Sequence, residues 1–173
     1  TTTICQGRTA ILRATGGNSY LWSDGTTNAY LSATQTGTYF VTVTNAQGCT
    51  ATTSETVIVN PLPEVTINGL TDICSGQQVS LFAMSPTAIQ FNWPMSGQQG
   101  QLVTVNPSTT TLYTVMVTDE NGCTNTASTT INVQSVPTPY LNGPTVICQG
   151  ETATYTISGG TSYLWSNGST AAT

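Results

Sequence analysis

The sequence repeats itself, and this internal repetition constrains the fold more than any other feature. An Ile-Cys-x-Gly motif at residues 4–7 recurs at 73–76 and 147–150. A Ser-Tyr-Leu-Trp-Ser-Asx-Gly motif at residues 19–25 recurs at 162–168. Because each motif returns at a similar spacing, we expect tandem copies of one structural unit that stack along the chain.

The repeats divide the chain into three parts. Residues 1–60 form a first repeat that lacks most of its leading strand, residues 61–137 a complete second repeat, and residues 138–173 the first half of a third. Proline-bearing joints at residues 60–63 and 136–139 separate them, and proline restricts both its own backbone and that of the preceding residue. We therefore expect short, stiff joints within a longer array, in which residues 140–173 expose half of a sandwich core.

Each repeat has the pattern of β-strands. In residues 38–44, Tyr39, Val41 and Val43 share one face, and threonines share the other face with Phe40. This alternation is typical of a half-buried antiparallel strand, and no window shows helical spacing. Short strands separated by Gly- and Asn-rich turns indicate β-sandwiches, so the expected fold class is all-β.

The aromatic residues indicate which kind of β-sandwich the repeats form. Tryptophans follow the Ile-Cys motifs at nearly equal spacings, and Gly-Thr-Tyr or Thr-Leu-Tyr precedes an alternating strand in the first two repeats. Both features fit an immunoglobulin-like sandwich with a core tryptophan and a corner tyrosine. We expect these aromatic residues in the core rather than on a ligand platform: Trp22, Trp93, Trp165, Tyr39 and Tyr113.

Composition excludes several functions. The chain has no His and no Lys, two Arg, seven acidic residues and a formal charge of −5, and threonine supplies 37 of its residues. Ser-His-Asp and Cys-His catalysis, Schiff-base lysines and imidazole zinc sites are therefore impossible. Two cations cannot neutralise a phosphate backbone, so we expect no nucleic-acid partner. No apolar run of about 18 residues is present, so we expect no membrane insertion.

The acidic residues show no paired arrangement that would suit a glycosidase. Residues 119–121, Asp-Glu-Asn, are the only dense oxygen cluster, and we interpret them as a hairpin turn rather than a calcium site. The expected protein is therefore not an enzyme and carries no metal or cofactor.

The combined motifs resemble a known group of repeats. These motifs are Ile-Cys-x-Gly, Gly-Gly-x-Ser-Tyr-Leu-Trp-Ser-Asx-Gly and Gly-Thr-Tyr-x-Val-x-Val-Thr-Asn-x-x-Gly-Cys. They resemble the tandem Ig-like and PKD-like repeats of large secreted surface proteins of Bacteroidota, including gliding-motility adhesins. The middle repeat departs from the pattern at residues 94–96, Pro-Met-Ser. The resemblance implies a linear array of sandwiches, export by the type IX route, and a role in adhesion or as a stalk.

The five cysteines recur at equivalent positions of the repeats, which favours disulfides in an oxidising compartment. In an immunoglobulin-like sandwich, the Ile-Cys cysteine lies at the C-terminal pole and the Gly-Cys cysteine at the other pole. A strand of about seven residues separates the poles by roughly 23 Å, whereas a disulfide needs Cα atoms within about 7 Å. In a head-to-tail array, however, the poles of adjacent units meet.

We therefore prefer an inter-repeat disulfide between Cys5 and Cys123, with Cys49, Cys74 and Cys148 pairing outside the chain. The within-repeat pairs Cys5–Cys49 and Cys74–Cys123 are the alternative, since the first cysteine could lie on a strand folded back along the sandwich. Free thiols are the third possibility.

The sequence thus predicts a non-catalytic repeat segment of an extracellular bacterial filament or adhesin stalk. Its partners would be further repeats of the same chain and neighbouring copies, with Phe40 and Met116 as possible lateral contacts on the outer, Thr-rich face. The alternative is a module of a secreted adhesin or enzyme that binds a surface glycan or a protein through exposed aromatics such as Tyr30. The expected location is the cell surface or a secreted filament.

Overall fold

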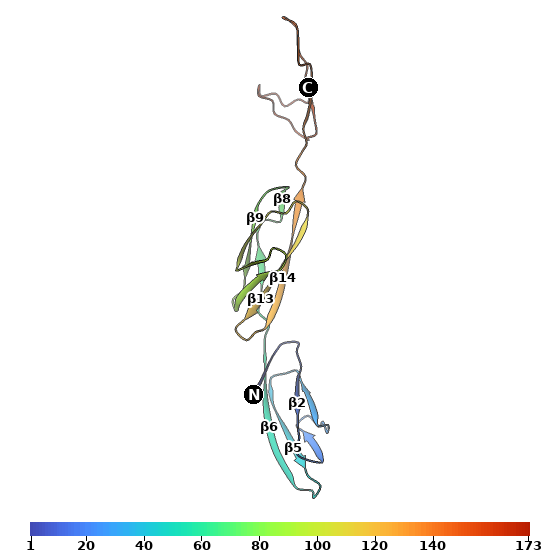
Figure 1. The fold of residues 1–173 in the computed structure, drawn as a ribbon, viewed down its shortest axis with the longest axis vertical. Coiled ribbons are helices and arrows are strands. Elements are labelled where there is room, and N and C mark those ends of the chain that lie inside the picture. The colour runs from blue at the N-terminus through green and yellow to red at the C-terminus, as the bar shows by residue number, and fades with distance from the viewer.

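The computed structural model describes residues 1–173, and all of its regular structure is β-strand. The molecule is a narrow rod in which strands β1–β6, β7–β14 and β15–β16 follow one another along the long axis (Figure 1). The strands are β1 (Thr2–Cys5), β2 (Ala10–Arg13), β3 (Ser19–Trp22), β4 (Tyr30–Ala33), β5 (Gly37–Thr44), β6 (Thr50–Asn60), β7 (Thr66–Asn68), β8 (Asp72–Cys74), β9 (Val79–Met84), β10 (Ala88–Trp93), β11 (Gln98–Gln99), β12 (Leu102–Val105), β13 (Thr111–Asp119), β14 (Thr124–Gln134), β15 (Tyr140–Asn142) and β16 (Thr156–Ser158). None of these elements is a helix that could span a membrane.

Strands β7–β14 form a complete sandwich. A three-stranded sheet, β12-β9-β7, faces a five-stranded sheet, β11-β10-β13-β14-β8, and only β8 runs parallel to its neighbour, β14. Twelve buried residues fill the space between the sheets, with Leu81, Val103 and Val115 fully enclosed. This pairing of sheets is that of an immunoglobulin-like β-sandwich, so the expected all-β fold class is confirmed.

Strands β1–β6 form a smaller sandwich of the same design. The sheet β1-β6-β5-β3 faces the two-stranded sheet β2-β4, and β1 runs parallel to β6. Eight buried residues make its own core, separate from that of the second sandwich. No strand here corresponds to β7 of the second sandwich, so β2 has a neighbour on one side only.

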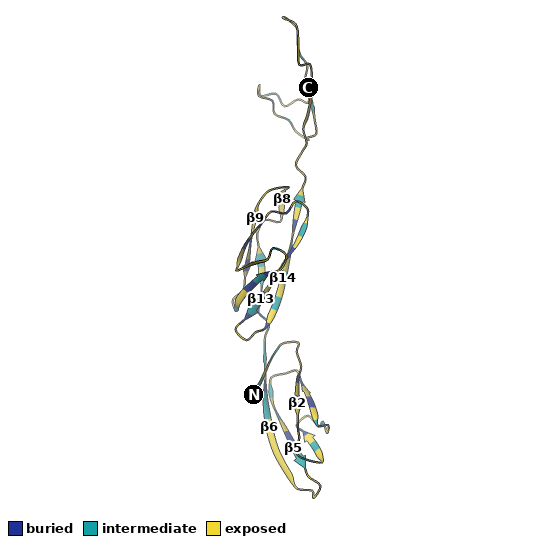
Figure 2. Ribbon diagram, in the orientation of Figure 1, coloured by how far each residue is buried: buried dark blue, intermediate teal, exposed yellow.

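Alternation along β5 and β6 explains how these strands are half-buried. Val41 is 3% exposed, and Tyr39 and Val43 pack beside it against the core. On the outer face, the hydroxyls of Thr38 and Thr56 lie 3.1 Å apart across the strand pair. The part of β6 that follows the β5–β6 hairpin, residues 50–54, is exposed (Figure 2). Threonine suits such a surface because its β-branched side chain favours a strand and its hydroxyl forms a hydrogen bond with a side chain on the neighbouring strand.

Each repeat holds its tryptophan by the same hydrogen bond. The indole N–H of Trp22 donates to the carbonyl of Asn28, that of Trp93 to Gly100 and that of Trp165 to Ala171, at 2.9, 3.0 and 2.7 Å. Trp22 and Trp93 are buried in their cores. Trp165 departs from the expected core position and is only half-buried, because β15 and β16 form a single two-stranded ladder with no opposing sheet.

Residues 138–173 contain no buried residue at all. Tyr140 and Leu141 of β15 are 67% and 56% exposed. The turns of this part nevertheless repeat those of the sandwiches, since the N–H of Glu151 donates to the carbonyl of Cys148 as that of Arg8 does to Cys5. Local turn chemistry is therefore present here without the long-range packing that encloses a core.

Candidate functional site: the junction between the two sandwiches

A disulfide joins the two sandwiches end to end. Cys5 and Cys123 are bonded, with their Cα atoms 5.5 Å apart and 118 residues between them in sequence. Cys5 is the last residue of β1 in the first sandwich, and Cys123 lies in the β13–β14 hairpin of the second. The bond therefore crosses the boundary, beside the backbone connection through residues 61–65.

Parallel pairing with β6 positions Cys5 at this boundary. Cys5 lies opposite Asn60, the last residue of β6, and the N–H of Gln6 donates to the Asn60 carbonyl at 2.8 Å. The chain then turns back, and Gly7 adopts a φ of 83°, which glycine tolerates without strain. Cys5 is thus held at the end of the sandwich from which the chain leaves towards the next unit.

The β13–β14 hairpin positions Cys123. The Asp119 carboxylate accepts hydrogen bonds from the N–H groups of Asn121 and Cys123, at 2.9 and 2.8 Å. Asn125 donates from its side-chain amide to the carbonyl of Pro63, at 2.9 Å, which fastens the hairpin to the joint. Cys123 is fully buried. The Asp-Glu-Asn cluster is a turn in which the Asp119 carboxylate accepts hydrogen bonds from backbone N–H groups. No group of three His, Cys, Asp or Glu side chains comes close enough to hold a metal ion.

The remaining cysteines, Cys49, Cys74 and Cys148, are exposed free thiols, so the within-repeat pairs Cys5–Cys49 and Cys74–Cys123 do not form. Cys74 ends β8 as Cys5 ends β1, and the N–H of the following Ser75 donates to the carbonyl of Gln134 at 2.8 Å.

Cys49 lies in the same kind of hairpin turn as Cys123. Its N–H donates to the side-chain oxygen of Asn45 at 2.9 Å, as that of Cys123 donates to Asp119. Cys49 and Cys74 therefore stand at the two outer ends of the pair of sandwiches, in the same turns that hold the bonded cysteines.

A second polar contact lies at the start of β1. The Thr2 hydroxyl donates a hydrogen bond to the carboxylate of Glu55 on β6, at 3.2 Å.

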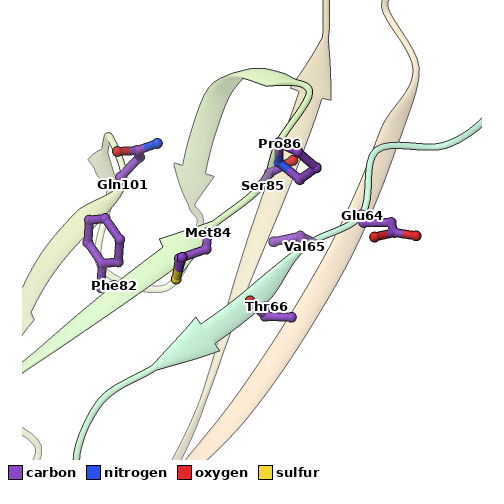
Figure 3. A pocket seen from close by; sticks show the side chains of 8 residues that line it. All are labelled: Glu64, Val65, Thr66, Phe82, Met84, Ser85, Pro86 and Gln101. Carbon is purple, nitrogen blue, oxygen red and sulfur yellow. The ribbon is translucent and has the colours of Figure 1, made fainter.

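A shallow hollow of about 450 Å³ lies beside β7 and β9 in the second sandwich. Figure 3 shows Phe82 and Met84 along β9, with Gln101 near Phe82 and Glu64 at the opposite end of the lining. Phe82 and Met84 are 39% and 48% exposed, so the hollow offers an apolar surface with few polar groups to orient a ligand.

Other exposed aromatic and apolar side chains stand on the outer faces of the sheets. Tyr30 is 54% exposed and lies under the guanidinium of Arg13, 5.9 Å from the centre of its ring. Phe40 and Met116, expected as lateral contacts, are 50% and 36% exposed on equivalent strands of the two sandwiches. Tyr113 is buried, whereas its counterpart Tyr39 is half-buried against the first core.

The fold and the junction together define a class: tandem immunoglobulin-like sandwiches joined by a disulfide between units. No protein-family model and no curated protein matches the sequence. Among solved structures, the chain is similar to murine CEACAM1b at 10% identity and a TM-score of 0.34, over 78% of this chain and 96% of that one.

It is also similar to the DIP-gamma IG1+IG2 structure at 14% identity and a TM-score of 0.30, over 78% of this chain and 92% of that one. A third similar structure is Bacteroides ovatus SGBP-B in complex with a mixed-linkage heptasaccharide. Its identity is 14% and its TM-score 0.26, over 76% of this chain and 42% of that one. Similarities at this level carry no information on function.

Proposed function

We propose that this chain is a non-catalytic structural segment of an extracellular bacterial filament or adhesin stalk, built from immunoglobulin-like units of about 1–60, 61–137 and 138–173. The observation that carries the proposal is the Cys5–Cys123 disulfide across the boundary between two sandwiches. A disulfide within a domain would stabilise that domain, whereas one between domains fixes their relative position. Fixed position along a rod is the property that a stalk or filament requires.

The exposed cysteines extend this argument beyond the two sandwiches. Cys74 occupies the turn of Cys5, and Cys49 occupies the turn of Cys123, yet both are free thiols. In the proposed array, each Ile-Cys cysteine pairs with the Gly-Cys cysteine of the following repeat. Cys74, Cys148 and Cys49 then bond to cysteines of further repeats or of neighbouring copies.

The low charge and the cysteines fit an exposed, oxidising location. A disulfide that persists is typical of secreted and cell-surface proteins. The hydroxyl-rich outer faces keep such a rod hydrated without ion pairs. Export by the type IX route and an origin in Bacteroidota rest on the motif resemblance and belong to the same proposal.

Peptide mapping of the native material under non-reducing conditions tests the proposal. Digestion with chymotrypsin, followed by mass spectrometry, should recover Cys74 and Cys148 each bonded to a cysteine that follows glycine in another repeat. Electron micrographs of the same material should show uniform fibres. Recovery of Cys49, Cys74 and Cys148 as unmodified thiols from intact native material would contradict the array.

The second candidate is a module that binds a glycan or a protein. The hollow formed by Phe82 and Met84, and the exposed Tyr30, are the surfaces that favour it. A glycan array and a pull-down with residues 1–137 separate the two functions, because a stalk segment should retain no specific ligand.

A further inference from the structure

The middle repeat differs from the other two on the outer face of its tryptophan strand. In the first and third repeats, Ser-Tyr-Leu precedes the tryptophan, at residues 19–21 and 162–164. At the same place β10 has Gln-Phe-Asn, with Gln90 and Asn92 instead of the serine and the leucine. Phe91 is buried, whereas Gln90 is exposed and Asn92 half-buried, so this strand presents two amides where its counterparts present a hydroxyl and an apolar side chain.

The loop after the tryptophan of β10 has changed as well. Residues 94–101 replace the shorter segment of residues 23–29 and bring glutamines to positions 98, 99 and 101. Two of these glutamines form β11, which pairs with β10 so that Gln99 lies opposite Asn92. The indole hydrogen bond to the carbonyl of Gly100 nevertheless anchors the loop as it does in the other repeats. The changes therefore gather on one surface while the anchor stays the same.

A hollow of about 640 Å³ lies over this surface, within the range of roughly 300–1,000 Å³ that is typical of small-molecule sites. It is lined by four amide side chains and two residues of β13, namely Gln90, Asn92, Gln99, Gln101, Met116 and Thr118. Met116 lies opposite Asn92 and Thr118 opposite Gln90, so these side chains form rows across neighbouring strands. The hollow belongs entirely to the second sandwich, and no charged residue lines it.

The chemistry of the lining matches neutral hydroxyl groups. Gln98 uses its amide within the chain, donating to the carbonyl of Thr104 at 3.2 Å, and does not line the hollow. The four amides that line it each present two N–H donors and one acceptor oxygen. A hydroxyl group both donates and accepts, so a ligand rich in hydroxyls can use all of these groups, whereas an ion would find no opposite charge.

An apolar surface continues from the amides. Gln101 also lines the hollow of about 450 Å³ that contains Phe82 and Met84, so the two hollows meet at this residue. Figure 3 shows Gln101 near Phe82. A sugar ring has hydroxyls at its rim and C–H groups on its faces, and an aromatic side chain such as Phe82 offers a flat apolar surface to such a face. The two hollows together exceed the size of one sugar.

We propose that these two adjoining hollows bind an uncharged oligosaccharide, with the amides bonded to its hydroxyls and Phe82 against the C–H face of a sugar ring. The proposal rests on the second candidate function and gives it a ligand class and a site. An extended peptide fits less well, because added strands bond to backbone groups at a sheet edge. β11 already occupies the edge of β10 at residues 92–93, so the hollow offers side chains instead.

Titration calorimetry on the full chain tests the site. The probes are hexasaccharides of glucose, xylose, mannose and N-acetylglucosamine, at up to about 10 mM. We expect at least one of them to bind, and the double variant Gln90→Ser with Asn92→Leu to weaken its binding at least tenfold. This variant carries the residues of the other two repeats, so the strand should fold normally.

The matched control is Gln134→Ser, which removes an exposed amide from the other end of β14 and should leave the affinity unchanged. Chemical denaturation should give the same stability for both variants. Absence of binding by all four sugars, or equal affinity of the double variant and the control, overturns the proposal.

A second variant tests the apolar part of the site. Phe82→Thr should weaken the same hexasaccharide at least fivefold, because the ring face loses its aromatic contact. Unchanged affinity in this variant overturns the two-hollow site.

Two further outcomes would assign the amides to another ligand. Equal or tighter binding of a negatively charged galacturonate hexasaccharide overturns the uncharged ligand. Self-association that only the double variant abolishes, measured by sedimentation, overturns it in favour of the hydroxyl-rich face of a second copy. None of these outcomes alters the Cys5–Cys123 bond, so peptide mapping tests the stalk proposal separately.

Discussion

At the scale of single residues, Gly17 permits the turn before β3 to lie close against β5. A Cβ at this position would lie 2.7 Å from the carbonyl oxygen of Thr44 and would collide with the side chain of Val43. We expect Gly17→Ala to destabilise the first sandwich by about 1–3 kcal/mol, because strand β5 must move to make room. Chemical denaturation measures the loss. Gly37→Ala is the control, since its Cβ would meet Tyr39 at an ordinary 3.7 Å and its stability should hardly change.

Asp119 shows how one acceptor fixes a hairpin. Its carboxylate accepts hydrogen bonds from two backbone N–H groups, and the residue is 6% exposed. Asp119→Ala leaves buried donors unpaired and should lower the free energy of unfolding of the second sandwich by about 1–3 kcal/mol. Asp119→Asn should be tolerated, because Asn45 makes the same contacts in the first sandwich. A loss of equal size in both variants, measured by denaturation, would show that the charge matters rather than the acceptor.

At the scale of elements, the strand patterns were predictable from the sequence, and so was the missing leading strand of the first repeat. The alternation in residues 38–44 indicates which side chains of β5 face the core, and Val41 is indeed buried. Trp22 and Trp93 could be placed in the core from their spacing alone, because both pack within a closed sandwich. Trp165 could not, since its burial depends on an opposing sheet rather than on its own turn.

Phe40 and Met116 interrupt the hydroxyl-bearing outer faces of the equivalent strands β5 and β13, where Phe40 lies opposite Ser54 and Met116 opposite Thr126. Because Phe40 is half exposed, Phe40→Thr should change the free energy of unfolding by less than about 0.5 kcal/mol. If the lateral contact exists, the same variant should reduce side-by-side bundling of fibres in electron micrographs. Unchanged bundling in a variant of normal stability would remove Phe40 from the contact.

At the scale of the whole molecule, the disulfide can be tested with one protease. Trypsin can cut only after Arg8 and Arg13, both of which are exposed. Without reductant, the peptide of residues 1–8 should remain attached to residues 14–173 through Cys5 and Cys123. Reduction should release it, and mass spectrometry distinguishes the two products. Release of residues 1–8 before reduction would show that Cys5 is not bonded to Cys123.

The same bond determines how tension travels through the rod. A pull on the two ends of the chain passes from Cys5 to Cys123 and then along β14, so the residues between the two cysteines form a closed loop outside the loaded path. β14 is already extended, so tension along it needs no ladder of hydrogen bonds to break. Stretching a single oxidised molecule should therefore lack the extension of roughly 400 Å that the 118-residue separation would release after reduction. Tandem sandwiches joined in this way carry tension through covalent bonds, and their folded cores bear almost none of the force.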